Sequence, residues 1–221
     1  MSKRIAVLAC SLLVTVVVGA QAPPVAGPRF RSGSVPELPA LAVGGGEVLL
    51  DVALDAAGRV TDITPVRSAQ PFTDATVAAV RGWLFVPPKD EERRPVPSRV
   101  LVGALFRPPA LYATAGDSSS ADVATPSREI PYPLGTVMPV FPPLAHGAGV
   151  VLLEALVGAS GGVESVQVIK SGPPFDSAAE DAARRWLFRP AYVAPRAEPR
   201  YVYLVFGFPA PMTGAAGPKP R

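Results

Sequence analysis

The stretch RRWLFRP at residues 184–190 has a near copy, RGWLFVP, at residues 81–87. Outward from this pair, a constant shift of 103 positions matches residues 36–87 to residues 139–190 without an insertion or deletion. Glycines, prolines and aromatic residues are among the identical residues, for example Gly58/Gly161, Trp83/Trp186 and Pro87/Pro190, and none of these is a typical catalytic residue. Because repetition of this kind marks duplicated structural units, the sequence predicts two copies of one small scaffold domain.

Composition argues against several classes of function. The net charge of the 221 residues is only +3, and no basic stripe is interleaved with aromatic residues, so a nucleic-acid partner is not expected. His146 is the only histidine and Cys10 the only cysteine, so one chain cannot assemble the usual zinc sites. No strand-turn-helix nucleophile elbow of the Gly-x-Ser-x-Gly type occurs. We therefore expect a protein without catalytic residues, metal or cofactor.

The start of the chain has the pattern of an export signal. Lys3 and Arg4 precede an apolar run at residues 5–18, and small residues follow. We predict a signal peptide at residues 1–20, cleaved before Gln21, and a periplasmic location. The alternative is an uncleaved anchor in the inner membrane, although the apolar run is shorter than the roughly 20 residues that span a bilayer comfortably.

Composition also divides the rest of the chain into segments. Stretches rich in proline, glycine and serine lack the apolar periodicity of folded elements. The predicted segments are a Pro/Gly-rich tether at 21–34, a first domain at 35–108, a flexible linker at 109–130, a second domain at 131–209 and a disordered tail at 210–221. The linker composition predicts that the two domains move independently.

Each copy begins with the pattern of a hairpin. Apolar residues alternate along residues 48–54, which predicts a half-buried strand. Gly58 in the first copy and Gly161 in the second suit the turn that follows, because glycine tolerates a positive φ. The return strand of the second copy is residues 163–170, whereas Pro65 in the first copy should lie at an edge or a bulge.

A helix and a last strand complete each copy. Phe72 and Phe175 open segments with small residues at helical spacing, and Ser177 with Glu180 fits a capping box. The last strands are residues 100–106 and 201–208. The predicted fold class is α+β, with two tandem β-β-α-β domains, each a three-stranded antiparallel sheet with one helix on one face. Such sheets leave open edges that can accept a partner strand.

Several side chains have more than one interpretation. Trp83 and Trp186 lie on the apolar stripe of each helix and are expected in the core rather than on a ligand platform. Asp51 and Glu154 occupy matching strand positions and are expected to face solvent. The arginines of the second helix end could bind an acidic partner or an anionic glycan, although solvated helix-end charge is favoured. These arginines are Arg184, Arg185 and Arg189.

The second copy resembles a known family. It carries Phe-Pro at 141–142, the glycine hairpin at 161–163 and the stretch ARRWLFRPA at 183–191. Together these residues resemble the C-terminal domain of TonB-type energy transducers over residues 139–209. The first copy, residues 36–108, matches that family more loosely.

The resemblance implies a partner and a mode of binding. A TonB C-terminal domain takes up an extended peptide of an outer-membrane receptor, or of another envelope protein, at a sheet edge. The implied peptide-binding edge here is Tyr201, Val202, Tyr203, Leu204, Val205 and Phe206. A second hypothesis is a membrane-anchored component of a TonB-type transducer, although the tether of this chain is short. A third is a structural envelope protein that self-associates, for example as a homodimer, through its sheet edges.

Overall fold

The computed structural model describes residues 27–39, 44–109, 120–193 and 195–211. It is an α+β structure that consists mostly of β-sheet and contains two helices in the described residues, so the predicted fold class is confirmed at this level. The predicted signal peptide, much of the predicted linker and nearly all of the predicted tail lie outside the described residues. We call residues 27–109 the first half and residues 120–211 the second half.

The main elements follow the same order in both halves. In the first half they are β2 (Gly46–Leu54), β3 (Val60–Ser68), α1 (Phe72–Val80), β4 (Leu84–Val86) and β5 (Ser98–Phe106). In the second half they are β8 (Gly149–Val157), β9 (Val163–Lys170), α2 (Asp176–Ala183), β10 (Leu187–Arg189) and β13 (Arg200–Phe208). The predicted return strand at 163–170 therefore coincides with β9.

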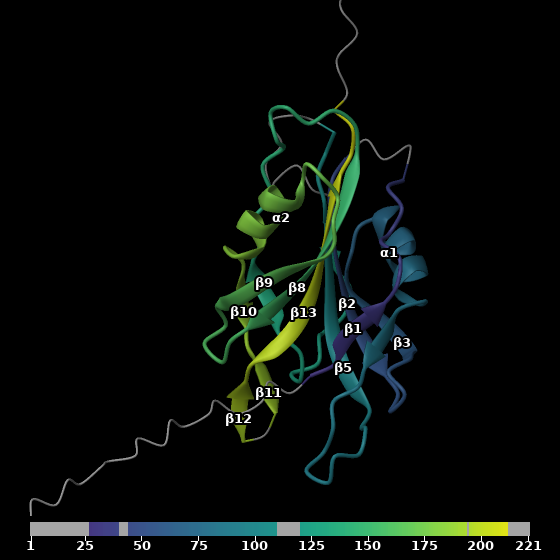
Figure 1. Cartoon of the computed structure of the whole chain (residues 1–221), viewed down its shortest axis with the longest axis vertical. Coiled ribbons are helices and arrows are strands. Elements are labelled where there is room, and N and C mark those ends of the chain that lie inside the picture. Colours follow the sequence, from purple (N-terminus) through teal and green to yellow (C-terminus); the bar gives the residue numbers. More distant parts are fainter. Residues whose placement is uncertain (1–26, 40–43, 110–119, 194, 212–221) are drawn as a thin grey trace, which may run out of the picture.

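The long strands form one sheet rather than two. Its seven strands run in the order β6-β3-β2-β5-β13-β8-β9, where β6 is the short strand Ala121–Asp122. Neighbouring strands are antiparallel except β5 and β13, which pair in parallel with Tyr203 opposite Val102. Figure 1 shows β13, in yellow, beside β8 and β5. The prediction of two separate three-stranded sheets is wrong, because the last strand of each half joins the two.

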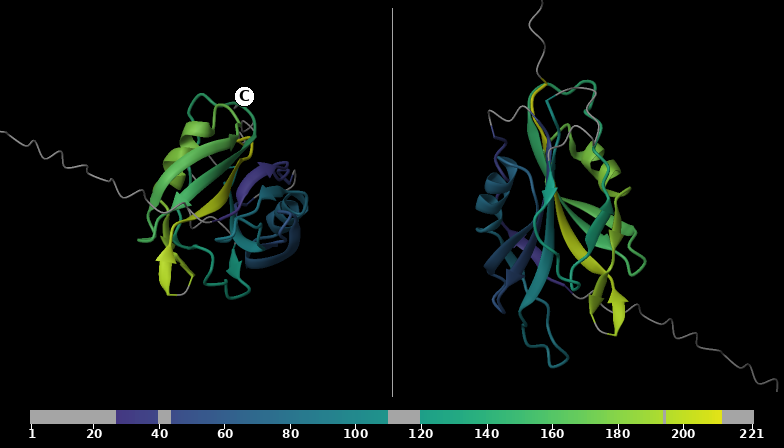
Figure 2. Two further views of the ribbon diagram at one scale, coloured as in Figure 1. Left: turned by 60° about the horizontal axis from the view of Figure 1, so that its bottom comes forward. Right: turned by 180° about the vertical axis from the view of Figure 1, so that it is seen from behind.

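The two helices cover opposite faces of this sheet. Phe72 of α1 packs in one core cluster with Val48 and Leu50 of β2. Ala179 of α2 packs in the other cluster. That cluster contains Leu49, the residue between Val48 and Leu50. Because successive side chains of a strand point to opposite faces, the two clusters lie on opposite sides of the sheet. Figure 2 shows α1 and α2 on either side of the central strands.

The central strands are consequently buried on both faces. Leu49 is 0% exposed and Asp51 is 3% exposed, although both belong to the alternate face of β2. The prediction of a half-buried strand at 48–54 is therefore wrong. Each half carries a helix on only one face, and the other half covers the face that remains. Tyr203 and Val205 of β13, for example, belong to the core cluster of α1.

Short ribbons cover the outer surfaces of the two cores. β1 (Arg29–Ser32) pairs with β4, and β7 (Tyr132–Gly135) pairs with β10, while β11 (Ala191–Val193) and β12 (Arg196–Glu198) form a hairpin. Phe30 of β1 packs edge-on against Trp83, with ring centroids 5.2 Å apart. The prediction of an unstructured tether is therefore wrong for residues 29–32.

The described end of the predicted linker is also part of the fold. Strand β6 pairs with the end of β3, and the backbone N–H of Val123 donates to the carbonyl of Val66 over 2.8 Å. Ile130 is buried in the core cluster of α2. This segment is thus attached to the fold at β6, Val123 and Ile130, so the prediction of a flexible linker is wrong there.

Local predictions about turns have mixed outcomes. Gly58 and Gly161 have φ of 77° and 88°, which confirms the predicted glycine turns. Pro65 lies opposite Leu50 beside an irregularity in the β2–β3 register, which confirms the predicted bulge. The capping box is wrong: α2 begins at Asp176 with no side-chain cap, so Ser177 lies inside the helix.

Both tryptophans lie in the core, as predicted. Trp83 and Trp186 are each 1% exposed. Their indole N–H groups donate to the carbonyls of Ser34 and Val137, over 2.8 and 3.1 Å. Each indole thereby anchors the segment that follows β1 or β7 to the end of a helix.

Candidate functional site

The strand predicted to bind a peptide is not at an edge of the sheet. Its six residues, Tyr201, Val202, Tyr203, Leu204, Val205 and Phe206, all lie in β13. β13 pairs with β8 along its whole length, and its residues 203–207 also pair with β5. Over Tyr203–Phe206 the main chain is occupied on both sides. The prediction of an open edge at this strand is therefore wrong.

The correction has a physical reason. An open edge strand presents a row of unpaired N–H and C=O groups, which favours pairing with another strand. β5 and β13 are the corresponding last strands of the two halves, and each supplies hydrogen-bond partners to the main chain of the other. β5 is enclosed as well, because it lies between β2 and β13.

Tyr203 joins the two halves through a buried polar cluster. Its hydroxyl accepts a hydrogen bond from the backbone N–H of Phe30 over 2.7 Å and donates to the carboxylate of Glu154 over 2.8 Å. Burial and the negative charge of Glu154 raise the pKa of Tyr203. The phenol is thus held in its neutral form as a hydrogen-bond donor.

Glu154 is also paired with a cation from the first half. Arg29 contacts it through two nitrogens, Nε and Nη2, over 3.0 and 2.7 Å. The same guanidinium lies over the ring of Tyr201, 4.1 Å from its centroid. A bidentate pair of this kind fixes geometry as well as charge. It ties β1 to strands β8 and β13.

Asp51 is the counterpart of Glu154, but its carboxylate has different hydrogen-bond partners. Its carboxylate accepts from Nε of Arg99 over 2.9 Å and from the backbone N–H of Ser127 over 3.2 Å. Asp51 and Glu154 are 3% and 4% exposed, so the prediction that they face solvent is wrong. Each buried acid holds a segment of the other half onto the sheet.

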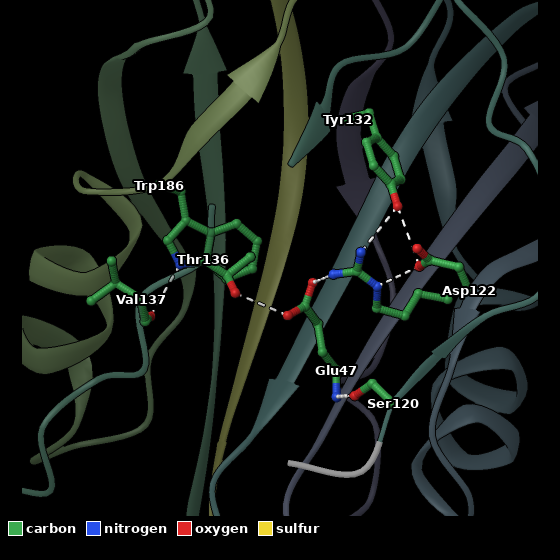
Figure 3. A network of polar contacts seen from close by, with 8 residues as sticks. Glu47, Ser120, Asp122, Tyr132, Thr136, Val137 and Trp186 are labelled. Atoms are coloured by element: carbon green, nitrogen blue, oxygen red, sulfur yellow. Dashed lines mark hydrogen bonds and ion pairs between the residues drawn. The ribbon is translucent and has the colours of Figure 1, made fainter. Parts of the chain in front are cut away.

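A third polar cluster lies beside β7 (Figure 3). Arg67 of β3 contacts Glu47 and Asp122, each over 2.7 Å, and donates to the hydroxyl of Tyr132 over 3.1 Å. The hydroxyl of Thr136 donates to Glu47 over 2.9 Å. These carboxylates are all engaged by cations or hydroxyls, and the cluster thereby joins β2, β3, β6 and β7.

Strand β9 forms one free edge of the seven-stranded sheet. Within the described residues, β9 pairs with β8 on one side and with no strand on the other. Val163, Val166 and Val168 pack against the core, while the exposed residues include Glu164 and Gln167. The opposite edge of the sheet is less continuous, because β6 covers the end of β3 and Pro65 removes one N–H from that strand.

Sequence reasoning identified the hairpin but not its role. The alternation of partly buried valines with exposed polar residues along β9 is typical of a strand with one solvated face, and it does not indicate whether the strand lies at an edge of the sheet. Within the described residues, no three His, Cys, Asp or Glu side chains gather as metal ligands would.

Comparison with known proteins identifies the family that the second half resembles. Residues 139–206 match the model of the family described as Gram-negative bacterial TonB protein C-terminal. The match spans strands β8 and β9, helix α2 and most of β13, which is less than half of the chain. It is a single copy, so a TonB-type domain in the first half stays a prediction.

The family match implies a TonB-like role in protein interactions of the cell envelope. A comparison with curated proteins found no match to this chain. Neither helix in the described residues combines the length and the apolar character that crossing a membrane requires.

Proposed function

We propose that this chain is a periplasmic protein-binding module that recognises an extended peptide of an outer-membrane receptor, or of another envelope protein, by strand addition at β9. The observation that carries the proposal is the free edge of β9 within the segment that matches the TonB C-terminal family. Strand addition needs a run of unpaired main-chain groups, with side-chain specificity supplied by alternate positions. The eight residues of β9 supply such a run.

The proposal includes the location and the absence of catalysis. The export signal predicted at residues 1–20 supports a periplasmic protein. Binding through the main chain needs no nucleophile, metal or cofactor. A mature chain that begins at Gln21, measured by mass spectrometry, would support the secreted form over the anchored transducer component.

The direct test is a titration followed by NMR. The isotope-labelled chain without residues 1–20 would be titrated with synthetic peptides from the periplasmic N-termini of outer-membrane receptors. We expect backbone amide shifts along Val163–Lys170 that saturate with peptide. Shifts confined to other strands, or no binding by any peptide, would contradict the proposal.

The chain itself offers a matched variant for this edge. Val168 lies opposite Leu153, just as Pro65 lies opposite Leu50 in the first half. Since β3 tolerates proline at that place, Val168→Pro should leave the β8–β9 pairing intact while removing an N–H from β9. We expect weaker peptide binding for Val168→Pro and unchanged binding for the control Pro65→Val.

Self-association is the competing use of the same edge. Two copies could pair β9 with β9, which the structural hypothesis requires. Sedimentation equilibrium separates the two functions: a dimer that is abolished by Val168→Pro and that excludes peptide would favour self-association.

A further inference from the structure

A pocket of about 570 Å³ opens in the second half, at residues that belong neither to β9 nor to β13. One wall comes from residues 125–128, which precede β7. The others come from β7, from Arg189 of β10 and from Tyr192 of β11. A volume of this size lies in the range of pockets that hold small organic ligands.

Two cations lie at the pocket without a carboxylate. Arg128 and Arg189 both line it, and none of the described residues that line it is acidic. Within the described part of the chain, neither guanidinium forms an ion pair, and Arg189 donates only to the carbonyl of Ser127, over 3.0 Å. Nearby Asp122 is already held by Arg67, and Glu129 projects from an exposed position.

The electrostatic environment of Arg189 favours an anion. Burial lowers the pKa of Arg189, and the positive charge of Arg128 lowers it further. Two like charges that face one shared space repel each other, and a bound anion would turn this repulsion into attraction. Guanidinium groups match the planar geometry of carboxylate and phosphate.

The remaining walls of the pocket are apolar. The side chains of Tyr132, Leu134 and Tyr192 line it, together with two prolines. Leu134 is 71% exposed and Tyr192 is 44% exposed, so both present apolar surface to solvent. A ligand with only an anionic group would leave this surface uncovered.

The corresponding place in the first half has a different chemistry. The position that holds Arg189 in the second half holds Val86 in the first, and the position of Leu134 holds Arg31. The combination of two cations with an apolar wall is therefore specific to the second half.

We propose that this pocket binds an organic anion, with a carboxylate or phosphate group held by Arg128 and Arg189 and an apolar body against Tyr132, Leu134 and Tyr192. The site is separate from β9, so the proposal stands whether or not that edge binds a peptide.

The test uses four small probes with the chain without residues 1–20. Phenylacetate and phenyl phosphate carry a ring and an anionic group, phenylacetamide carries the ring without charge, and inorganic phosphate carries the charge without the ring. We expect calorimetry to give saturable binding of at least one ring-bearing anion, tighter than that of both controls. The comparison of the two anions identifies the preferred head group. Equal binding of phenylacetamide or of inorganic phosphate would overturn the proposal.

Two variants locate the binding. Arg189→Val installs the residue that the first half carries at this position, and Arg128→Ser removes an exposed side chain, so the second variant keeps the test valid if the first fails to fold. Loss of one charge-assisted contact should weaken binding about 10- to 100-fold. The control Arg185→Ser removes an exposed charge outside this pocket and should bind as the unaltered chain does. Unchanged affinity in the folded Arg128 and Arg189 variants would overturn the proposal.

Discussion

At the scale of single residues, buried polar groups connect the two halves. A buried carboxylate is costly unless it is paired and hydrogen-bonded. Glu154 meets this condition through Arg29 and Tyr203, and Asp51 meets it through Arg99 and the backbone of Ser127. The contacts of Glu154 with Arg29 and of Asp51 with Ser127 form only when the halves are packed together, so they specify the arrangement as well as stabilise it.

The first prediction concerns Tyr203. Tyr203→Phe removes the acceptor for the N–H of Phe30 and a donor to Glu154, leaving two buried groups each short of a partner. The free energy of unfolding should fall by about 1–3 kcal/mol, measured by urea denaturation. Tyr192→Phe is the control: its hydroxyl bonds only to the carbonyl of Pro195 at an exposed site, so the change should stay within about 0.5 kcal/mol. Equal stability of the two variants would show that the Tyr203 cluster contributes nothing.

At the scale of elements, short strands are attached to the sheet largely by side chains. β6 has only two residues, and Asp122 attaches it to β3 through the ion pair with Arg67. β1 is attached in the same way through Arg29 and the ring of Phe30. Two- and four-residue strands have few ladder hydrogen bonds, so such side-chain contacts add to the attachment of these strands.

The second prediction follows from the ion pair of β6. The hydrogen bond from Arg67 lowers the pKa of Asp122 below its ordinary value. The pair therefore contributes stability above about pH 4, and this contribution is lost as pH falls through the lowered pKa. Because Asp122 is largely exposed, we expect Asp122→Asn to cost less than about 1 kcal/mol at pH 6 and to match the unaltered chain near pH 2.

Urea denaturation between pH 2 and pH 6 checks this difference. Glu164→Gln is the control, because Glu164 is exposed and forms no ion pair among the described residues. A gap between Asp122→Asn and the unaltered chain that persists at pH 2 would assign the effect to packing rather than to charge.

At the scale of the whole molecule, the β5–β13 pairing makes the halves depend on each other. The strands pair over residues 203–207, and the second half supplies Leu152, Tyr203 and Val205 to the core of the first. Separation would open two sheet edges and expose apolar surface on both sides. This arrangement excludes the independent domain motion that the linker composition predicted.

The third prediction tests this dependence. A fragment of residues 120–221 would expose β13 and the face that β1 and β4 cover. We expect it to be unfolded, or to associate through β13, rather than to form a stable monomer, because exposed edges and apolar faces promote pairing. Sedimentation equilibrium and a two-dimensional NMR spectrum of the fragment provide the measurement. A folded monomer with dispersed resonances would contradict the prediction.

The sequence by itself determined the long strands and the helix of each half, and their order. Strand alternation, helical spacing and the turn glycines Gly58 and Gly161 are local patterns, and each acts within a few residues of chain. Trp83 and Trp186 were correctly placed in the core, although they follow the helices rather than lie in them. The resemblance in the second half to the TonB C-terminal family also came from contiguous residues.

Only the tertiary structure decided which strand edge is free. Main-chain hydrogen bonds are the same for every sequence, so the pairing of β5 with β13 carries no local signature. One trace of it was present: the run at residues 48–54 has apolar side chains at Leu49 as well as at Val48 and Leu50, as strands buried on both faces do. The pairing moved the open edge from β13 to β9 and turned Asp51 and Glu154 from expected surface acids into buried anchors, because both outcomes depend on contacts between distant segments.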